Sequence, residues 1–454
     1  MHLTIDDVLR ATDARLVRGG ENHFVSVTAD SRKISVGSLF VALKGERFNG
    51  EDFCIEAIDK GAGGVLVSND CDPKNIPPTG IVFAVDNTLD AYQKIAAAWR
   101  NKFDIPIVAI TGSNGKTTTK DLTAAALSSL GSILKTTANY NNEIGVPQTL
   151  LELNENHRAA VIEIGMRGLN QIAPLAALVR PTVGIVTNVG ETHIELLGSI
   201  ENIARAKAEL VEAIEPGGAV ILNADDENVS AMIDRVKPGV KVVTFALEHD
   251  ATLRAENLIT KRSSTMFTLK YKDETYDCGI PIIGRHNVSN ALAAIAAAAV
   301  VGLKTDEIRA GFTTLATTKM RFEIIDRNGI QIINDAYNAS PASMRVALST
   351  TAEIASGRKI AVLGDMLELG NRSESIHRSI GADLAKNNFG VLVTFGKLGR
   401  LIAEGAKEAG VEKIFTADTH EQAAEYLRGL VKKGDTILFK GSRAMRMEKI
   451  IELI

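Results

Sequence analysis

The chain has 454 residues, 45% of them hydrophobic and 23% charged, and its formal net charge at pH 7 is -4. This composition predicts a globular protein of about three domains, each large enough to bury a core. The mild negative charge and the lack of a basic run argue against nucleic acid and membranes as partners, so we expect small-molecule ligands.

Cysteine usage and the first residues indicate a compartment. Three cysteines are too few and too scattered for a disulfide framework or a Cys-rich metal site, which suits a reducing environment. The first ten residues carry Asp6 and Asp7 instead of the basic and apolar stretches of a signal peptide. The most apolar helical segment, residues 291–301, is too short to span a bilayer. We therefore expect a cytoplasmic protein.

Residues 1–85 form the first expected domain, a small α/β module with short apolar strands such as residues 38–43. Residues 86–316 form the second domain. From residue 105 onward, apolar strands alternate with helix-length segments, which predicts a doubly wound parallel sheet. Its later strands are expected at residues 159–164, 183–189, 219–223 and 241–245.

An Ala-rich helix at residues 290–301 closes the second domain, and residues 313–319 form the expected linker. Residues 317–454 form the third domain. Strands again alternate with helices there, which predicts a second, Rossmann-like α/β sheet. Its strands are expected at residues 330–333, 359–363, 391–395, 413–416 and 436–439.

A glycine-containing turn joins the buried strand at residues 105–110 to a helix at residues 120–130. It reads T-G-S-N-G-K-T-T, a variant of the phosphate-binding pattern G-x-x-x-x-G-K-[ST] in which Ile110 replaces the first glycine. Backbone N–H groups and a helix N-terminus point at one spot in such a turn, the lysine adds charge, and the next hydroxyl can ligate Mg²⁺. We predict nucleotide binding here; the alternative is an ordinary turn with a solvated lysine. The predicted binding residues are Gly112, Ser113, Asn114, Gly115, Lys116, Thr117 and Thr118.

Polar residues also follow other central strands, where ligands of open α/β sheets gather. Glu163 interrupts a buried strand, which is costly unless the carboxylate binds a metal or forms a buried ion pair. His193 follows the strand at residues 183–189, and Lys207 lies on a predicted helix. A lone histidine at a strand end is more often a hydrogen-bonding residue than a ligand, and a helical lysine is usually solvated.

Four further stretches are candidates. Asn287 and Asn290 open the Ala-rich helix, where either would commonly be a cap. Residues 334–341 follow a strand and offer a carboxylate, an amide and an aromatic ring to a ligand, or simply start a helix with the serine as N-cap and the proline at the first position. Arg321, just past the linker, can supply charge to a phosphate, although most lone arginines are surface residues. Residues 440–443 form another turn with the features of an anion site.

Together these segments resemble the Mur ligase family of cell-wall peptide synthetases over nearly the whole chain. The string N-Y-N-N-E-I-G-V-P at residues 139–147 and the string G-D-M-L-E-L-G at residues 364–370 indicate which activity within the family to expect. The other matching segments are residues 30–32, 36–45, 111–118, 187–193, 206–207, 334–338 and 440–443. Two local departures occur: residues 48–52 read F-N-G-E-D where the family has an Asp-Gly-His string, and residues 339–341 read A-S-P where it has Ala-Asn-Pro.

The resemblance implies a three-domain α/β architecture with a UDP-substrate-binding domain, a central ATP-binding domain and a C-terminal Rossmann-like domain. It implies ATP and two Mg²⁺ ions, with Thr117 and Glu163 at the nucleotide metal and His193 at the second metal. Lys207 would be carbamylated by CO₂ beside that second metal. By the same resemblance the catalytic residues are Lys116, Lys207, His193 and Arg321; further ATP contacts are Asn287, Arg321, Asp335, Tyr337 and Asn338; and substrate contacts are Ser31, Arg32, Asn141 and Asn142.

The implied reaction is ATP-dependent addition of D-alanyl-D-alanine to UDP-N-acetylmuramoyl-tripeptide, which gives the pentapeptide. A carboxylate is a poor electrophile, so transfer of the γ-phosphoryl group to it produces an acyl phosphate that the amine attacks. Because both reactants of the first step are anions, two Mg²⁺ ions, Lys116 and Arg321 are expected to neutralise the developing charge. We expect a monomer whose third domain closes onto the second around residues 313–319.

Two kinds of rival function are considered. An amino-acid-adding Mur ligase or a folate polyglutamylating ligase shares the phosphate loop and the metal site, but the two discriminating strings point away from both. A GTPase switch or a nucleic-acid motor also has a phosphate loop. The sequence has no N-K-x-D guanine-reading string and no basic run, which argues against this second class.

Overall fold

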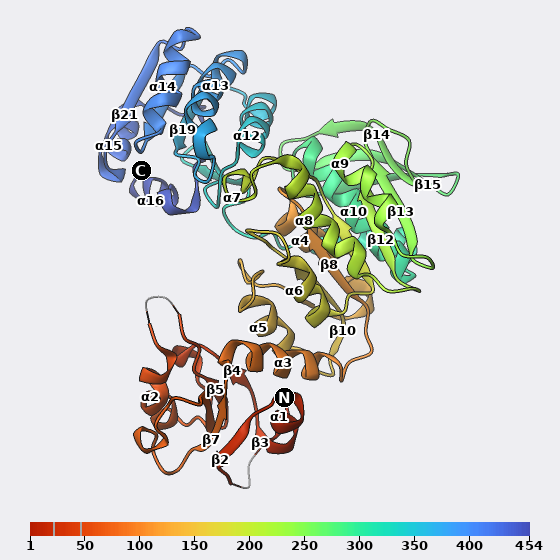
Figure 1. Cartoon of the computed structure of the whole chain (residues 1–454). Helices are drawn as coiled ribbons and strands as arrows, with labels where there is room; N and C mark the ends of the chain where they lie inside the picture. Colours follow the sequence, from red (N-terminus) through yellow and green to blue (C-terminus); the bar gives the residue numbers. More distant parts are fainter. Residues whose placement is uncertain (21–22, 46–47) are drawn as a thin grey trace. The chain divides into compact units, whose positions relative to one another are not determined.

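The computed structural model describes residues 1–20, 23–45 and 48–454 of the chain (Figure 1). The chain clusters into two compact units, each built from several stretches of sequence. The first unit comprises Met1–Ala109, Leu130–Gly165 and Ile172–Val183, and the second comprises Ile110–Ser129, Met166–Gln171 and Gly184–Ile454. The division crosses strand β8 (Ile107–Thr111), which leads into the phosphate loop.

A five-stranded sheet organises the N-terminal part of the first unit. Its strand order is β2-β7-β6-β5-β4, with β4 to β7 parallel and β2 antiparallel to β7. Alternate residues of the short apolar strands, such as Val65 and Val67, pack in one core with Ala57 of helix α2, so the predicted α/β module is confirmed. The strands are β2 (Arg15–Arg18), β4 (Val27–Thr28), β5 (Leu39–Val41), β6 (Gly64–Ser68) and β7 (Ile81–Val85), the separate pair is β1 (Leu3–Thr4) and β3 (His23–Phe24), and the helices are α1 (Ile5–Ala11), α2 (Cys54–Asp59) and α3 (Thr88–Arg100).

The remainder of the first unit belongs to the central sheet. Strand β10 (His157–Glu163) pairs in parallel with β9 (Ser132–Lys135), and helices α5 (Gly145–Leu151) and α6 (Ile172–Val179) flank β10 in the sequence. Strand β10 ends at Glu163, so this carboxylate lies at the carboxyl edge of the sheet, as predicted.

The central sheet has nine strands in the order β16-β15-β14-β13-β12-β11-β8-β10-β9. The predicted parallel part is confirmed: β12 has the expected bounds, and its partner β13 extends one residue beyond them. The sequence analysis missed strands β14 to β16, which continue the sheet with antiparallel pairs β14–β15 and β15–β16. Its other elements are β11 (Val183–Val186), β12 (Ala219–Asn223), β13 (Lys241–Ala246), β14 (Leu253–Thr260), β15 (Thr265–Tyr271) and β16 (Glu274–Ile280), with helices α4 (Lys116–Ala126), α7 (Ile194–Leu197), α8 (Ile200–Ala213), α9 (Glu227–Ser230), α10 (Arg285–Val301) and α11 (Thr305–Gly311).

The antiparallel extension escaped prediction because its turn lacks the usual sequence signal. Lys272 and Asp273 connect β15 to β16, and both have left-handed φ angles, 52° and 62°. Two-residue hairpin turns of this kind normally contain glycine or asparagine, because those residues adopt positive φ at little cost. A Lys-Asp pair therefore does not predict a hairpin.

The C-terminal sheet has six strands in the order β17-β18-β22-β19-β20-β21. All five predicted strands are present, and β20 has the predicted bounds. The added edge strand β17 is antiparallel to β18 and joined to it through Asn328-Gly329, which have φ angles of 56° and 77°. An Asn-Gly pair between apolar runs is a strong hairpin signal, which the sequence analysis overlooked. The strands are β17 (Glu323–Arg327), β18 (Ile330–Asn334), β19 (Lys359–Gly364), β20 (Val391–Phe395), β21 (Lys413–Ala417) and β22 (Thr436–Lys440).

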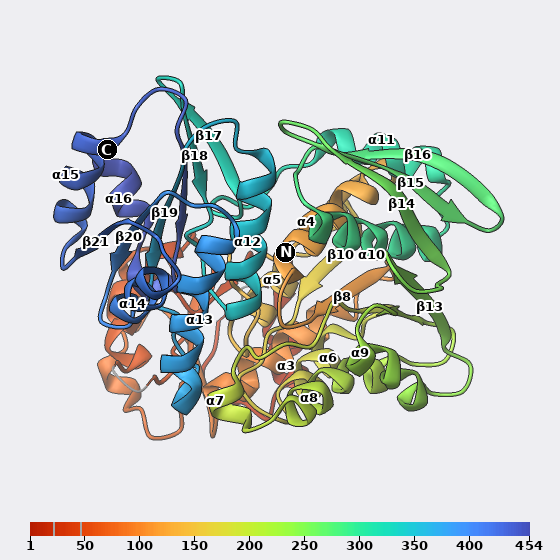
Figure 2. The same cartoon turned by 90° about the horizontal axis from the view of Figure 1, so that it is seen from above.

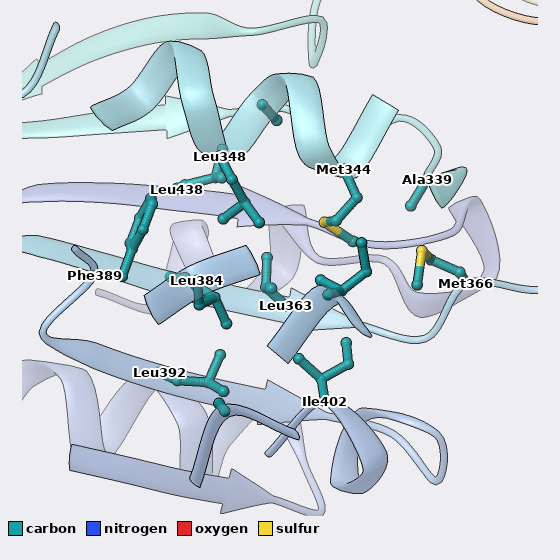
Figure 3. Packing of buried hydrophobic residues seen from close by; sticks show 14 of the residues in the cluster. Ala339, Met344, Leu348, Leu363, Met366, Leu384, Phe389, Leu392, Ile402 and Leu438 are labelled. Atoms are coloured by element: carbon teal, nitrogen blue, oxygen red, sulfur yellow. The ribbon is translucent and has the colours of Figure 1, made fainter. Parts of the chain in front are cut away.

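Helices cover both faces of this sheet, which makes it doubly wound (Figure 2). Helices α12 to α14 pack on one face, where Leu348 of α12, Leu363 of β19 and Leu384 of α13 converge (Figure 3). Helices α15 and α16 cover the other face. Helix α12 starts as predicted, with Ser340 as N-cap and Pro341 at its first position. The helices are α12 (Pro341–Ile354), α13 (Ser373–Lys386), α14 (Gly399–Glu408), α15 (His420–Leu430) and α16 (Glu448–Leu453).

None of the helices in the described ranges combines the length and the apolar character needed to cross a membrane.

Candidate active site

The phosphate loop bends through two glycines that no other residue can replace without strain. Gly112 has φ +151°, and a Cβ atom there would lie 1.8 Å from Oγ1 of Thr187. Gly115 has φ +82°, and its Cβ would lie 2.6 Å from Oδ1 of Asn290. Helix α4 begins immediately afterwards, at Lys116. The turn therefore leads directly into a helix N-terminus, the arrangement that binds phosphate.

The loop is held in this shape by the segment that follows strand β11. The backbone N–H of Asn114 donates to Oδ1 of Asn188 (2.9 Å), and the carbonyl of Asn114 accepts from the Thr187 hydroxyl (2.7 Å). Oγ of Ser113 accepts from the Gly190 N–H (2.8 Å) and donates to the Gly190 carbonyl (3.0 Å). These bonds fix the loop before any ligand arrives, so little ordering cost remains for binding.

Two cations lie at the start of α4. Nζ of Lys116 donates to the Gly112 carbonyl at 2.7 Å, so the ammonium folds over the loop. Nη2 of Arg321 donates to Oγ1 of Thr117 at 3.2 Å, and the guanidinium lies 3.9 Å from the centre of the Tyr337 ring. Nε of Arg321 is buried and has no hydrogen-bond partner among the described residues. A buried donor beside a phosphate loop fits a polyphosphate oxygen.

Lys207 is buried and His193 is partly buried. Lys207 on α8 is 2% exposed, so the solvated-lysine alternative is wrong. Burial lowers the pKa of its amine well below the ordinary value, the nearby Lys116 charge lowers it further, and Asp226 opposes the shift. His193 has φ 65° and precedes α7. Desolvation lowers the pKa of His193, although Glu368 favours its charged form.

The buried Lys440 pairs with the partly buried Asp335 in the C-terminal domain. Nζ of Lys440 lies 2.6 Å from Oδ2 of Asp335 and donates to the Asn338 carbonyl at 3.0 Å. Burial lowers the pKa of Lys440, and Asp335 opposes that shift. Oδ1 of Asp335 accepts from the Phe322 N–H at 3.1 Å. Both oxygens of Asp335 are thus engaged within the protein, next to the segment that carries Arg321.

Asn287 and Asn290 do not cap α10, contrary to the common expectation, because the helix begins earlier, at Arg285, with Gly284 as its N-cap. Nδ2 of Asn287 donates to the Ile283 carbonyl (2.7 Å), and Nδ2 of Asn290 donates to Oδ1 of Asn287 (3.2 Å). Oδ1 of Asn290 accepts from the Thr119 hydroxyl at 3.2 Å. Asn290 therefore braces the phosphate loop from behind.

The first unit holds the predicted substrate residues and Glu163. Glu163 is 3% exposed, and its Oε1 accepts from Nδ2 of Asn141 at 2.8 Å. Asn142 uses Oδ1 to accept from the N–H of Gly145 (2.9 Å) at the start of α5. The neighbouring residue, Tyr140, has its hydroxyl 3.4 Å from Nζ of Lys33.

That lysine ends the short 3₁₀ helix Ser31–Lys33. Within it, Arg32 is exposed, and its guanidinium forms a two-bond pair with Asp30 at 2.8 Å and 2.9 Å. Arg32 holds the pKa of Asp30 below its ordinary value. The two predicted substrate segments, residues 31–32 and 141–142, therefore meet through the contact between their neighbours, Lys33 and Tyr140.

Three models of Mur ligase domains match successive parts of the chain. In chain order, residues 23–100 match the model of the Mur ligase family catalytic domain, residues 110–298 that of the Mur ligase middle domain, and residues 320–443 that of the Mur ligase glutamate ligase domain. The UDP-N-acetylmuramoyl-tripeptide--D-alanyl-D-alanine ligase of Bacillus subtilis is 38% identical over 429 residues, covering 94% of this chain and 92% of the relative.

This chain belongs to the Mur ligase family.

Solved structures confirm the three-domain α/β architecture of this Mur ligase. The crystal structure of MurF from Acinetobacter baumannii is 30% identical, with a TM-score of 0.91, and covers 100% of this chain and 98% of that one. The structure of the MurF ligase of Thermotoga maritima in complex with ADP is 27% identical, with a TM-score of 0.83, and covers 94% and 96% of the two chains.

Among the predicted metal residues, the donors of Thr117 and Glu163 fit Mg²⁺. A threonine hydroxyl and a carboxylate are hard oxygen donors, which Mg²⁺ prefers, and it takes few protein ligands because it keeps several waters. Within the described ranges, no group of three or more His, Cys, Asp or Glu side chains has the spacing of a metal cluster. Only two of the four predicted residues, Glu163 and His193, are of those types.

The structure brings many of the predicted residues of the second unit together. Lys116, Thr117 and Arg321 lie together at the loop, and the ring of Tyr337 packs against the Arg321 guanidinium. Asp335 and the Asn338 carbonyl instead accept hydrogen bonds from Lys440. The bracing roles of Thr187, Asn188 and Asn290 were not predicted from the sequence. The string Thr187-Asn188 was noted only as part of the resemblance, and a polar pair directly after a central strand was the signal that would have found it.

Proposed function

We propose that this Mur ligase uses ATP to join D-alanyl-D-alanine to UDP-N-acetylmuramoyl-tripeptide, forming the pentapeptide, ADP and phosphate for peptidoglycan synthesis. The observation that carries the proposal is full-length similarity to relatives named for this activity, together with a braced phosphate loop that lies beside Arg321. Phosphoryl transfer depends on positioning and charge neutralisation, which this loop supplies.

In the first step, an oxygen of the terminal carboxylate of the tripeptide attacks the γ-phosphorus of ATP, and the bond to the ADP oxygen breaks. The N–H groups of Ser113 and Asn114 are bonded to Asn188, so the N–H groups at the start of α4 hold the phosphates. Lys116 and Arg321 neutralise charge on the transferring group. In the second step, the amine of D-alanyl-D-alanine attacks the acyl carbon. Phosphate leaves and the nitrogen loses a proton, so an amide forms.

When bound, two Mg²⁺ ions would screen the negative charges of ATP and the carboxylate. We assign Thr117 and Glu163 to the nucleotide metal and His193 and Lys207 to the second metal. Asn141 holds Oε1 of Glu163 at 2.8 Å, so it fixes one carboxylate oxygen and orients the other.

We further propose that Lys207 carries a carbamate. Burial lowers the pKa of the Lys207 amine, so the neutral form is favoured. The nitrogen of this neutral amine bonds to the carbon of CO₂ and releases a proton. The product is a carbamate, which is an anionic oxygen donor. This product would restore charge balance beside Lys116. Incubation with ¹³C-bicarbonate should give a carbamate carbon resonance in the wild-type protein and none in Lys207→Ala.

For the substrates, we assign Ser31 and Arg32 to the UDP portion and Asn141 and Asn142 to the sugar-peptide. To the nucleotide side we assign Asn287, Asp335, Tyr337 and Asn338. Asp335 acts there through its hydrogen bond to the Phe322 N–H, next to Arg321. We place the domain boundaries at residues 85/86 and 316/317; the second lies between the family matches that end at residue 298 and begin at residue 320, whereas the first family match extends to residue 100. We expect the enzyme to work in the cytoplasm as a monomer, with closure of the third domain around residues 313–319.

The deciding experiment combines the protein with ATP, Mg²⁺, UDP-N-acetylmuramoyl-tripeptide and D-alanyl-D-alanine. Phosphate release and the UDP-linked product are followed together by mass spectrometry. One dipeptide added per phosphate released supports the proposal. Phosphate release without product would instead indicate a sibling ligase or another ATPase.

A further inference from the structure

Helix α4 carries two adjacent buried charges just beyond the phosphate loop. Lys120 and Asp121 have side chains that are 2% and 3% exposed, and Nζ of Lys120 lies 3.4 Å from Oδ1 of Asp121. Burying a charge costs free energy unless it is paired and hydrogen-bonded. Neither residue belongs to the set assigned to ATP, metal or substrate, so the pair calls for a separate role.

The second oxygen of Asp121 reaches a distant part of the chain. Oδ2 accepts two hydrogen bonds from Thr318, one from its backbone N–H at 2.9 Å and one from its hydroxyl at 2.7 Å. Thr318 lies in the segment between the 3₁₀ helix Phe312–Thr314 and strand β17. Hydrogen bonds to a carboxylate are about twice as strong as neutral ones, so this contact anchors the segment firmly to α4.

The anchored segment carries Arg321 on a strained backbone. Met320 and Phe322, on either side of Arg321, have left-handed φ angles of 61° and 53°. A left-handed backbone is strained for a non-glycine residue and persists only when its surroundings hold it.

The downstream half of the segment is held by contacts from the C-terminal domain. The Met320 carbonyl accepts from the N–H of Tyr337 at 3.2 Å, and the Phe322 N–H donates to Asp335 at 3.1 Å. The bond from Asp121 to Thr318 supplies the upstream hold. Arg321 is thus clamped from both sides, with its guanidinium 3.2 Å from the Thr117 hydroxyl.

We propose that Asp121 is a positioning residue for ATP: through Thr318 it ties the linker to the phosphate-loop helix, and this sets Arg321 against Thr117 and the nucleotide. Lys120 compensates the buried charge of Asp121. The inference rests on the role in ATP binding proposed for Arg321. It makes the linker a part of the nucleotide site instead of a passive connection between domains.

The test uses Thr318→Val, which removes the hydroxyl bond and keeps the size and the backbone N–H of the residue. Thr317→Val is the matched control, because Thr317 is the exposed neighbour of the same type. The affinity for ADP is measured by calorimetry with no peptide substrate present, so the result does not depend on which ligase reaction the enzyme performs. We expect Thr318→Val to bind ADP about 10-fold more weakly, the loss that follows from one hydrogen bond to a charged group. Thr317→Val should bind as the wild type does.

A double-mutant cycle with Arg321→Ala separates positioning from general damage. If Thr318 acts through Arg321, adding Thr318→Val to Arg321→Ala should weaken ADP binding no further. Equal effects of Thr318→Val in both backgrounds would overturn the proposal, and so would unchanged ADP affinity in the single variant. Thr318→Ser keeps the hydroxyl and should restore the affinity. Asp121→Asn is a second variant, and melting curves confirm that each protein folds.

Failure of this inference differs from failure of the proposed function. A wrong reaction assignment would appear as the absence of pentapeptide product, with the ADP cycle unaffected. If Asp121 did not have the proposed role, only the ADP double-mutant cycle would give the contradicting result. Product formation by Thr318→Val would then be normal.

Discussion

His193 and Glu368 lie 2.7 Å apart, Nδ1 to Oε2, and link the loop after β11 to the loop after β19. Both residues have left-handed backbones, with φ angles of 65° and 64°, so each loop is shaped to present its side chain. Histidines that ligate metals usually direct their other ring nitrogen to a carboxylate, which fixes the orientation of the ring. Glu368 stands in that position relative to His193.

Glu368→Gln should therefore weaken the metal-dependent steps. Loss of an outer carboxylate of this kind typically costs about 10- to 100-fold in metal affinity or activity. We expect a fall of that size in kcat/KM and a matching rise in the Mg²⁺ concentration needed for half-maximal rate. Arg372→Gln is the control, because Arg372 pairs with Glu191 at 2.6 Å across the same two loops but at the surface. Its effect should stay within a few-fold, and equal effects of both variants would contradict the assignment.

Gly115→Ala should abolish tight nucleotide binding while leaving the fold intact. The new methyl group would lie 2.6 Å from Oδ1 of Asn290 at a φ of +82°, so the loop must shift away from its phosphate-binding shape. Strain of this kind amounts to about 1–3 kcal/mol, which corresponds to a loss of about 5- to 150-fold in ADP affinity. Gly190→Ala is the control, because its Cβ would be 3.6 Å from the nearest atom, Cβ of Ser113. Normal ADP binding by Gly115→Ala would show that the loop does not bind phosphate.

The fold was largely predictable because parallel strands buried on both faces appear in the sequence as short apolar runs. Strand β20 has its predicted bounds, and Ser340 and Pro341 start α12 as expected. These features depend on local sequence. The phosphate loop is equally local, since its glycines, lysine and threonine are consecutive.

The remaining features depend on contacts between residues far apart in sequence. Asp121 and Thr318 are 197 positions apart, and nothing in either neighbourhood indicates that they meet. Lys207 is likewise buried because of the elements that pack on α8. The sequence alone predicts that a lysine on a helix is solvated. Composition and periodicity report which face of an element is apolar; they do not report which element covers it.

Lys207→Ala should abolish ligation, with a loss of at least about 1,000-fold in kcat, because a neutral methyl group cannot supply the proposed anionic donor. Added bicarbonate should not restore the rate. Lys304→Ala is a control for loss of a lysine as such, since Lys304 is the N-cap residue of helix α11 and is assigned no role in the site. Full activity of Lys207→Ala in the coupled phosphate and product assay would refute the assignment of Lys207 to the metal site.

His377 should make the protein less stable in acid. It is fully buried, its Nε2 accepts from the Met366 N–H at 3.0 Å, and its Nδ1 lies 2.6 Å from the Ser373 carbonyl. This pattern requires a neutral ring with the proton on Nδ1. Burial accordingly lowers the pKa of His377, although the Ser373 carbonyl and Asp365 favour the charged form.

The sign of the effect follows from proton binding. Below about pH 6.5 the unfolded chain binds a proton at this histidine more readily than the folded chain does, so the stability contributed at neutral pH falls as the pH falls. His377→Gln cannot be protonated, so its melting temperature should depend less on pH between about pH 5 and 7.5. At neutral pH it should be destabilised by about 1–2 kcal/mol through poorer hydrogen bonding. His23→Gln, at an exposed position, controls for loss of a histidine as such. If the melting temperature of His377→Gln fell as steeply with falling pH as that of the wild type, His377 would not be the cause of the acid sensitivity.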